Sequence, residues 1–226
     1  MLSSICMSVC VFQSEKGSSW IEAELAKPGK ATVKEQTKAW KLSKMNVLAE
    51  EKRTAEYRVQ TLAVNWYSPK VSAELNRKLT ALVKSQTSGW SKKSHESSGG
   101  NYGMKLTASS GSIISMIIDY SEWADSASLT DYHMKSLTFS VEDGKLKPLS
   151  LSRFINWGKE KEFWSLVSRR YSAETGTSEP VNVQKALHLV WHLVPTGVKW
   201  NIDLTDGRGR FETYVTTWND LRAFLR

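Results

Sequence analysis

Hydrophobic and polar residues first fall into a regular pattern at residue 57. From residue 57 to residue 67 they largely alternate, which predicts a β-strand that Ser68-Pro69 ends. The next apolar residues recur every three or four positions, as in an amphipathic helix that stops before Gly89: Val71, Leu75, Leu79, Leu82 and Val83. A strand followed by a helix therefore opens the patterned part of the chain.

Short strands dominate the middle of the chain. After a loop expected at residues 91–103, rich in Ser, Lys, Gly and Asn, strands are predicted at 102–108 and 112–120. The turn residues Ser109-Ser110-Gly111 separate them, which indicates a hairpin. A second pair, at 136–141 and 146–149, flanks a turn that contains Asp143-Gly144.

The last third mixes helices and strands. Phe163, Trp164, Val167 and Tyr171 predict a helix, which Ser150 or Ser152 could cap, and a polar loop is expected at 172–180. Strands at 187–195 and 198–204 flank a turn at 195–197, and a short strand at 213–215 precedes a terminal helix at 217–225. Hairpins interleaved with helices predict an α+β fold, a mainly antiparallel sheet with helices packed on one face.

The first 45 residues carry less pattern. Residues 14–44 are polar and rich in lysine, with one strand expected around 37–42. The apolar run at 5–12 is too short to span a bilayer, and it is either a residual secretory signal or an ordinary strand. We therefore expect an N-terminal lead-in at 1–45, a strand-helix part at 46–110 and a C-terminal domain at 111–226, with no integral membrane span.

Composition places the chain among ordinary globular proteins and suggests an anionic partner. Of its 226 residues, 40% are hydrophobic and 24% charged, and the ten tryptophans could fill a core or anchor an interface. A formal net charge of +8 favours anionic partners. Nucleic acid is not expected, because the basic residues are scattered and form no run, Arg-rich arm or zinc-finger spacing.

The order of motifs in the C-terminal half resembles the RsiV-like domain of unknown function. The matching stretches are Ile-Ser-Met-Ile-Ile-Asp-Tyr at 114–120, Leu-Thr-Phe-Ser-Val-Glu-Asp-Gly-Lys-Leu at 137–146 and Leu-Ser-Leu-Ser-Arg-Phe at 149–154. Two more are the strand-turn-strand at 191–198, with a Gly after a Pro, and Trp-Asn-Asp-Leu at 218–221. The strand and helix at 59–67 and 73–83 look like that domain's N-terminal companion, so the resemblance covers roughly residues 57–225.

That family implies a setting outside the cytoplasm. Its members include the extracellular part of a lysozyme-sensing anti-sigma factor and a module attached to a peptidoglycan deacetylase. The resemblance thus implies a periplasmic or extracellular binding domain that works at the cell wall. Where the family usually carries a Gly-Gly-Ala-His turn, this chain has residues 123–133, with His133 as the counterpart of the histidine.

The sequence shows no convincing centre for metal or nucleophilic chemistry. His188 and His192 lie in a predicted strand, where four residues span about 13 Å, too far for both to hold one ion. His95-Glu96 lacks the second histidine of a zincin helix. Cys6 and Cys10, the only cysteines, have no partner pair or nearby histidine, and neither a nucleophile elbow nor a phosphate-binding loop occurs. We therefore expect no catalytic, metal or cofactor-binding residue.

Acidic pairs leave one enzymatic alternative open. Asp119 with Glu122, or Asp125 with Asp131, could serve as the two carboxylates of a hydrolase that processes the cell wall, although spacing in sequence does not fix their separation. Acids in loops are more often simply solvated. The main expectation is a protein without catalysis of its own.

The segment 122–133 is the best candidate for recognition. It is expected to be a long connection between strands, and such connections on a rigid sheet often carry binding residues. The candidate partner-binding residues are Trp123, Asp125, Asp131, Tyr132 and His133. In the alternative interpretation, Trp123 and Tyr132 only cover the edge of the sheet.

Together these features predict an exported binding protein with a protein partner. That partner would be a secreted cell-wall hydrolase or toxin, which the chain recognises or inhibits as an immunity protein does, or the partner would be peptidoglycan itself. An acidic hydrolase suits the charge of +8 better than strongly basic lysozyme.

Overall fold

A computed structural model describes eight segments of the chain. They are residues 19–27, 32–36, 57–87, 99–123, 131–176, 182–186, 188–203 and 211–226. The expected strand at 37–42, the apolar run at 5–12, both cysteines and His95 lie outside the described residues.

A five-stranded sheet forms the centre of the molecule. Its order is β2-β4-β5-β6-β7, and every neighbouring pair is antiparallel except the short parallel pair β2–β4. The strands are β2 (Tyr57–Val59), β4 (Gly99–Ser109), β5 (Ile113–Trp123), β6 (Asp131–Glu142) and β7 (Lys145–Pro148). Two tight turns make the hairpins, and Asp143 and Gly144 adopt the left-handed conformation that the β6–β7 turn requires, with φ of 51° and 70°.

A three-stranded antiparallel sheet and a strand pair complete the β structure. The small sheet has the order β10-β9-β8 and consists of β8 (His188–Val194), β9 (Gly197–Asp203) and β10 (Glu212–Thr217). A Cβ on Gly197 would lie 2.1 Å from the Thr216 carbonyl oxygen, so only glycine lets β9 start this close to β10. β1 (Thr32–Gln36) pairs with β3 (Thr61–Asn65).

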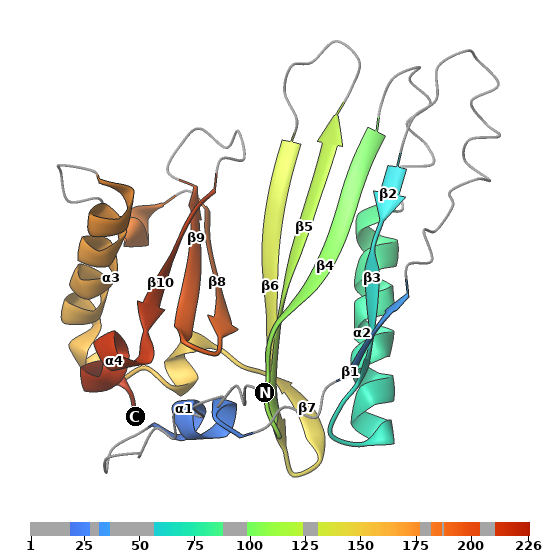
Figure 1. The fold of residues 1–226 in the computed structure, drawn as a ribbon, viewed down its shortest axis with the longest axis horizontal. Coiled ribbons are helices and arrows are strands. Elements are labelled where there is room, and N and C mark those ends of the chain that lie inside the picture. The colour runs from blue at the N-terminus through green and yellow to red at the C-terminus, as the bar shows by residue number, and fades with distance from the viewer. Residues whose placement is uncertain are drawn as a thin grey trace, which may run out of the picture.

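Each of the larger sheets carries a helix on one face (Figure 1). The helices are α1 (Trp20–Leu25), α2 (Pro69–Thr87), α3 (Glu160–Thr175) and α4 (Trp218–Leu221). The apolar stripe of α2 packs on the five-stranded sheet, where Leu75 and Leu79 share a core with Met116 and Ile118. The stripe of α3 packs on the small sheet, where Phe163 and Trp200 share a second core with Ile21 of α1.

The small sheet stands with one edge against the five-stranded sheet. β8 is an edge strand, and its Leu193 N–H donates to Ser115 Oγ of β5 over 3.0 Å; Ser115 Oγ is also 2.8 Å from Thr138 Oγ1 of β6. All three residues are buried. Alternate residues of β5 therefore face opposite ways: Ile114, Met116 and Ile118 face α2, whereas Ile113 and Ser115 face β8.

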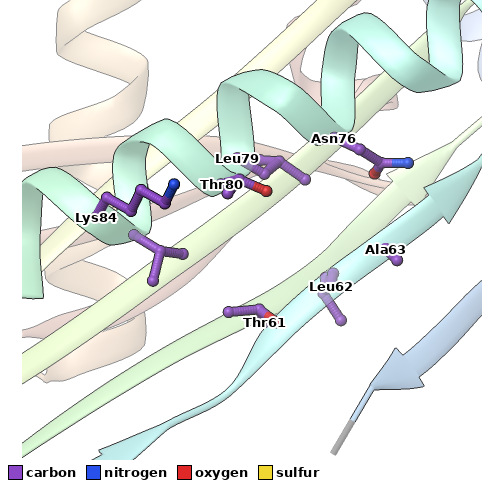
Figure 2. Close-up of a pocket in the computed structure, with 8 residues that line it drawn as sticks. Thr61, Leu62, Ala63, Asn76, Leu79, Thr80 and Lys84 are labelled. Atoms are coloured by element: carbon purple, nitrogen blue, oxygen red, sulfur yellow. The ribbon is translucent and has the colours of Figure 1, made fainter. Parts of the chain in front are cut away.

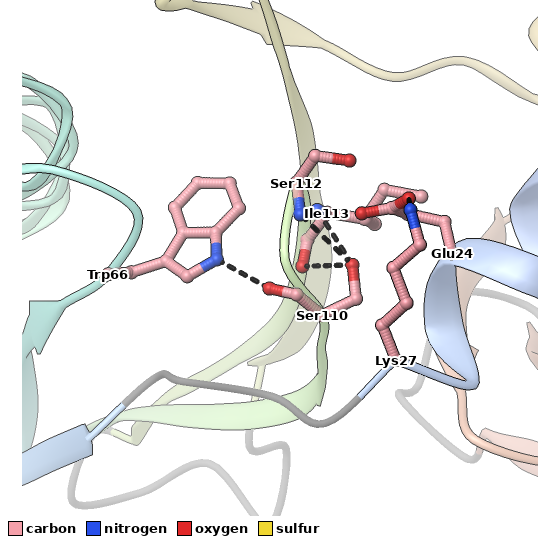
Figure 3. Close-up of polar contacts among 6 residues, drawn as sticks. All are labelled: Glu24, Lys27, Trp66, Ser110, Ser112 and Ile113. Atoms are coloured by element: carbon pink, nitrogen blue, oxygen red, sulfur yellow. Dashed lines mark hydrogen bonds and ion pairs between the residues drawn. The ribbon is translucent and has the colours of Figure 1, made fainter.

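A hydrogen-bond network ties the start of α2 to the base of the sheet (Figure 3). The Trp66 indole N–H donates to the Ser110 carbonyl over 2.8 Å, and Ser110 Oγ accepts from the Ile113 N–H over 2.9 Å. Beside this turn, Glu24 of α1 pairs with Lys27. Burial raises the pKa of Glu24, but hydrogen bonds from Lys27 and Ser112 outweigh it and hold the pKa below its usual value. Three segments far apart in sequence therefore meet at this turn.

The α+β class is confirmed, and several predicted boundaries are corrected. Residues 99–103, expected in a loop, pair along β5, and β6 begins at Asp131 rather than 136, because strand pairing continues past the apolar runs. The helix expected from 150 or 152 is a 3-10 turn, Leu151–Arg153, followed by α3 from Glu160; Ser150 makes no side-chain cap bond, and α3 extends to Thr175 in the expected loop.

The division at 45 and 110 stays a prediction, although two observations bear on it. β4 and β5, on either side of residue 110, are hydrogen-bonded neighbours, so both parts build one sheet. Ile21, inside the expected lead-in, is fully buried in the second core. Among the described residues, no helix has the length and apolar character needed to cross a membrane.

Candidate partner-binding surface

The connection expected at 122–133 is shorter than the sequence suggests. β5 runs to Trp123 and β6 starts at Asp131, so most of the candidate residues belong to paired strands. In the register of β5 and β6, Tyr132 pairs with Ser121, and His133 pairs with Tyr120. Asp125 lies outside the described residues, and of Asp131 the structure describes the backbone position but not the side chain. The remaining candidates sit on rigid strand ends rather than in a free loop.

Tyr132 and His133 point to opposite faces of the sheet, because neighbouring residues of a strand alternate. His133 lies on the α2 face, where it ends a row of directly paired rings that crosses three strands. The ring centroids are 6.5 Å apart for Tyr102 and Tyr120 and 4.6 Å apart for Tyr120 and His133, and both pairs are stacked. Exposure increases along this row, from buried Tyr102 to exposed His133.

Trp123 and Tyr132 share the other face, the one towards β8. Trp123 is 36% exposed, one of the few large apolar side chains that reach solvent among the described residues. Tyr132 is half-buried and meets Phe211, just before β10, edge to face with ring centroids 5.7 Å apart. Burial, and then the nearby Asp119 carboxylate, raise the pKa of Tyr132, which keeps its hydroxyl protonated as a hydrogen-bond donor.

We call this group the Trp123 surface: Asp119, Ser121 and Trp123 of β5, Tyr132 of β6, and Phe211. The Asp119 side chain is exposed. A Cβ on Gly103 of β4 would lie 2.6 Å from an Asp119 carboxylate oxygen, so the carboxylate can occupy this position only because residue 103 is glycine. Two aromatic rings beside a carboxylate and a hydroxyl can stack against an apolar group and hydrogen-bond to a polar one.

The acidic pair Asp119 and Glu122 is not brought together. An odd separation of three along β5 puts the two side chains on opposite faces of the sheet, where they cannot flank one bond. For the alternative pair, Asp125 is outside the described residues and the Asp131 side chain is not described.

The small sheet contains two histidines, four residues apart. His188 and His192 both belong to strand β8, as predicted from their alternating pattern, and among the described residues no three His, Cys, Asp or Glu side chains gather around one point. His192 is 3% exposed, and its Nδ1 accepts from the Asn201 amide over 3.1 Å. Burial, then Lys199 and Lys105, lower the pKa of His192 to about 4, so it is neutral at pH 7.

Some of this surface could not be anticipated. The opposed faces of Tyr132 and His133 follow from strand alternation, once β6 is known to begin before them. Phe211 carries no such indication, because its contact with Tyr132 joins residues 79 apart in sequence, which only the tertiary fold brings together.

Comparison with known proteins identifies the fold alone. No family model matches the chain, and no curated protein matches its sequence. Among solved structures, the chain is similar to a DUF3298 family protein from Pseudomonas aeruginosa, with a TM-score of 0.59 and 10% identity over 89% of this chain and 96% of the other. A DUF3298 member from Bacteroides fragilis has a TM-score of 0.49 and 10% identity, over 93% of this chain and 96% of its own. The chain therefore has the fold of a DUF3298 protein along most of its length.

Proposed function

We propose that this chain is a non-catalytic binding protein of the bacterial envelope, periplasmic or extracellular, which recognises and inhibits a cell-wall hydrolase. The likeness in fold to a DUF3298 protein supports this, together with the resemblance of residues 57–225 to the RsiV-like domain, one of whose members senses lysozyme. The observation that carries the proposal is the exposed Trp123, held beside Tyr132 and Asp119 on one face of a paired strand end.

The chemistry of the Trp123 surface suits a protein or glycan ligand. Trp and Tyr anchor interfaces because each buries a large area while losing little side-chain freedom. The rings belong to paired strands and Tyr132 is further held by Phe211, so little ordering is needed on binding. The net charge of +8 favours an acidic hydrolase, and the exposed Asp119 can accept hydrogen bonds from it.

The direct test is binding of the purified chain to a panel of purified peptidoglycan hydrolases, acidic and basic, with inhibition of their lytic activity as a second readout. We expect Trp123→Ala to weaken the affinity for a captured hydrolase by about tenfold to a hundredfold, the loss typical of a central interface residue. Trp20→Ala is the matched control, because Trp20 is 40% exposed but lies on α1 at the base of the molecule.

Isolated peptidoglycan and intrinsic lysis complete the experiment. Binding to peptidoglycan alone, weakened by Trp123→Ala, would redirect the proposal from the hydrolase to the wall. Lysis by the purified chain that disappears with Asp119→Asn would replace it with an enzymatic function. Absence of binding to every hydrolase and to peptidoglycan would overturn it.

A further inference from the structure

A small pocket lies on the other side of the five-stranded sheet, between β3 and the second half of α2 (Figure 2). Its volume is about 180 Å³. The lining residues come from these two elements only: Thr61, Leu62 and Ala63 of β3, and Asn76, Leu79, Thr80, Val83 and Lys84 of α2.

The pocket exists because β3 is tied down on both sides of Leu62. On one side, the Gln60 N–H donates to the Tyr102 carbonyl of β4 over 2.7 Å. On the other, the Asn76 amide accepts from the Val64 N–H over 2.9 Å and donates to the Val64 carbonyl over 3.1 Å. Backbone groups two residues apart share an edge of a strand, so Leu62 directs its own N–H and carbonyl to this same edge. The walls are thus held by the fold itself.

The lining combines an apolar base with polar groups. Leu62, Leu79 and Val83 are each at most 7% exposed and belong to the core beneath. Thr61 and Thr80 bring hydroxyl groups, Thr80 and Lys84 lie one turn apart on α2, and Lys84 is exposed (Figure 2). Among the residues that the structure describes, no acidic side chain pairs with Lys84. The pocket therefore has a cationic end that no carboxylate of the described chain neutralises.

The size limits what can enter. A cavity of about 150 Å³ accommodates benzene, whereas sites for larger molecules have about 300–1,000 Å³. One group the size of a leucine side chain fits, and a nucleotide or flavin does not. A carboxylate complements the charge of Lys84. We therefore propose that this pocket binds an aliphatic carboxylate, whose branched apolar group packs against Leu62, Leu79 and Val83 and whose carboxylate pairs with Lys84. A free short-chain acid and the C-terminal residue of a peptide offer the same chemistry.

This site is separate from the Trp123 surface. It lies on the α2 face of the sheet, whereas Trp123 and Tyr132 face β8. Its test uses small ligands and no hydrolase, so either proposal can fail while the other stands.

Amide chemical shifts in an NMR titration provide the measurement. The probes are 4-methylpentanoate, the tripeptide acetyl-Ala-Ala-Leu with a free carboxylate, and the same tripeptide as its C-terminal amide. We expect shifts that cluster at Leu62, Ala63 and Thr80, with dissociation constants on the order of 1–10 mM for ligands of this size. The amide should bind about twofold to fivefold more weakly than the free tripeptide, as befits an exposed ion pair. Tighter binding of the tripeptide than of the free acid would identify a peptide C-terminus as the source.

Three variants make the result specific. Lys84→Gln should remove the preference for carboxylate over amide, and Lys70→Gln, an exposed lysine at the start of α2, should keep it. Thr80→Leu, at an exposed position that tolerates the change, should fill the pocket and reduce the shifts from every probe. The proposal is wrong if shifts fail to cluster at the pocket at ~50 mM ligand, well above these constants, or if Lys84→Gln keeps the full preference for carboxylate.

Discussion

Tyr102 and Tyr171 are both 1% exposed, yet their hydroxyl groups have opposite surroundings. The Tyr171 hydroxyl donates to the Glu212 carboxylate, across from α3 to β10. The Tyr102 hydroxyl has no partner among the described residues, and burial raises the pKa of Tyr102 well above its ordinary value. A buried polar group without a partner costs free energy that a bonded one does not.

Only the removal of the Tyr171 hydroxyl should therefore lower the free energy of unfolding. Tyr102→Phe should leave the free energy of unfolding unchanged or raise it by up to about 1 kcal/mol, because an unsatisfied group is lost while the ring stack with Tyr120 remains. Tyr171→Phe should lower it by about 1–3 kcal/mol, because Glu212 loses its donor. Urea denaturation of both variants measures this, and a clear loss in Tyr102→Phe would mean that its hydroxyl does have a partner.

His192 makes stability depend on pH. Its pKa is about 4 in the folded chain, through burial and then through Lys199 and Lys105, against an ordinary value of 6.5. The folded state thus binds this proton less readily than the unfolded state, so the stabilisation is complete above pH 6.5 and is lost as the pH falls from 6.5 towards 4.

The difference between wild type and a variant isolates that contribution. From pH 7.5 to pH 5 we expect wild type to lose about 2 kcal/mol more unfolding free energy than His192→Gln, whose amide oxygen can still accept from Asn201. Urea denaturation at both pH values gives the two losses, and other titrating groups cancel in the comparison. Equal losses in the two proteins would show that His192 is not held neutral by the fold.

Trp66 matters because it joins elements rather than because it fills space alone. Its indole N–H reaches the Ser110 carbonyl, 44 residues away, and its backbone N–H and carbonyl are both bonded by Ser72 Oγ at the start of α2. One side chain and its backbone thus fix the β3–α2 connection against the turn between β4 and β5.

Trp66→Phe keeps an aromatic ring but leaves the Ser110 carbonyl without its hydrogen-bond donor. We expect a loss of about 2–4 kcal/mol in the free energy of unfolding, from the unpaired carbonyl and the smaller ring together. Trp20→Phe, at a side chain 40% exposed, should cost no more than about 0.5 kcal/mol. If chemical denaturation gives similar small losses for both, the bond to Ser110 does not hold the elements together.

The elements were more predictable from sequence than their ends and partners. Alternation and helical spacing locate α2, the β4–β5 hairpin and the β8–β9 turn, because these patterns follow from local geometry. Of the eight described tryptophans, six lie in or against a core, as the dense apolar runs suggest. The extension of β6 back to Asp131 and the departure of β3 to pair with β1 depend on distant strands, which no local pattern reports.

The candidate site shows the same limit at finer resolution. Residue type and position near a strand end single out Trp123 and Tyr132, and the structure places them on one face of the sheet. The same criteria indicate His133, but its side chain lies on the opposite face, because neighbouring residues of a strand point to opposite sides. The sequence indicates Asp119 only as a possible catalytic acid, because its position near Tyr132 depends on the register of the strands.

The net charge of the molecule should govern the rate at which a partner associates, and the Trp123 surface should govern the rate at which it dissociates. The net charge of +8 attracts an acidic hydrolase over distances that salt screens, because the Debye length falls from about 14 Å at 50 mM salt to about 4 Å at 500 mM. Contacts made by Trp123 and Tyr132 act only after docking and are short-ranged.

Association and dissociation rates measured against one captured acidic hydrolase separate the two contributions. From about 50 to 500 mM salt, we expect the association rate constant to fall by about tenfold or more, with a much smaller change in the dissociation rate constant. Trp123→Ala should instead raise the dissociation rate constant and leave the salt dependence of association unchanged, because it removes no charge. An association rate constant that salt does not change would show that the excess of lysine and arginine does not serve partner recognition. A captured partner that is strongly basic would show the same, because a positive field cannot speed the approach of a protein of like charge.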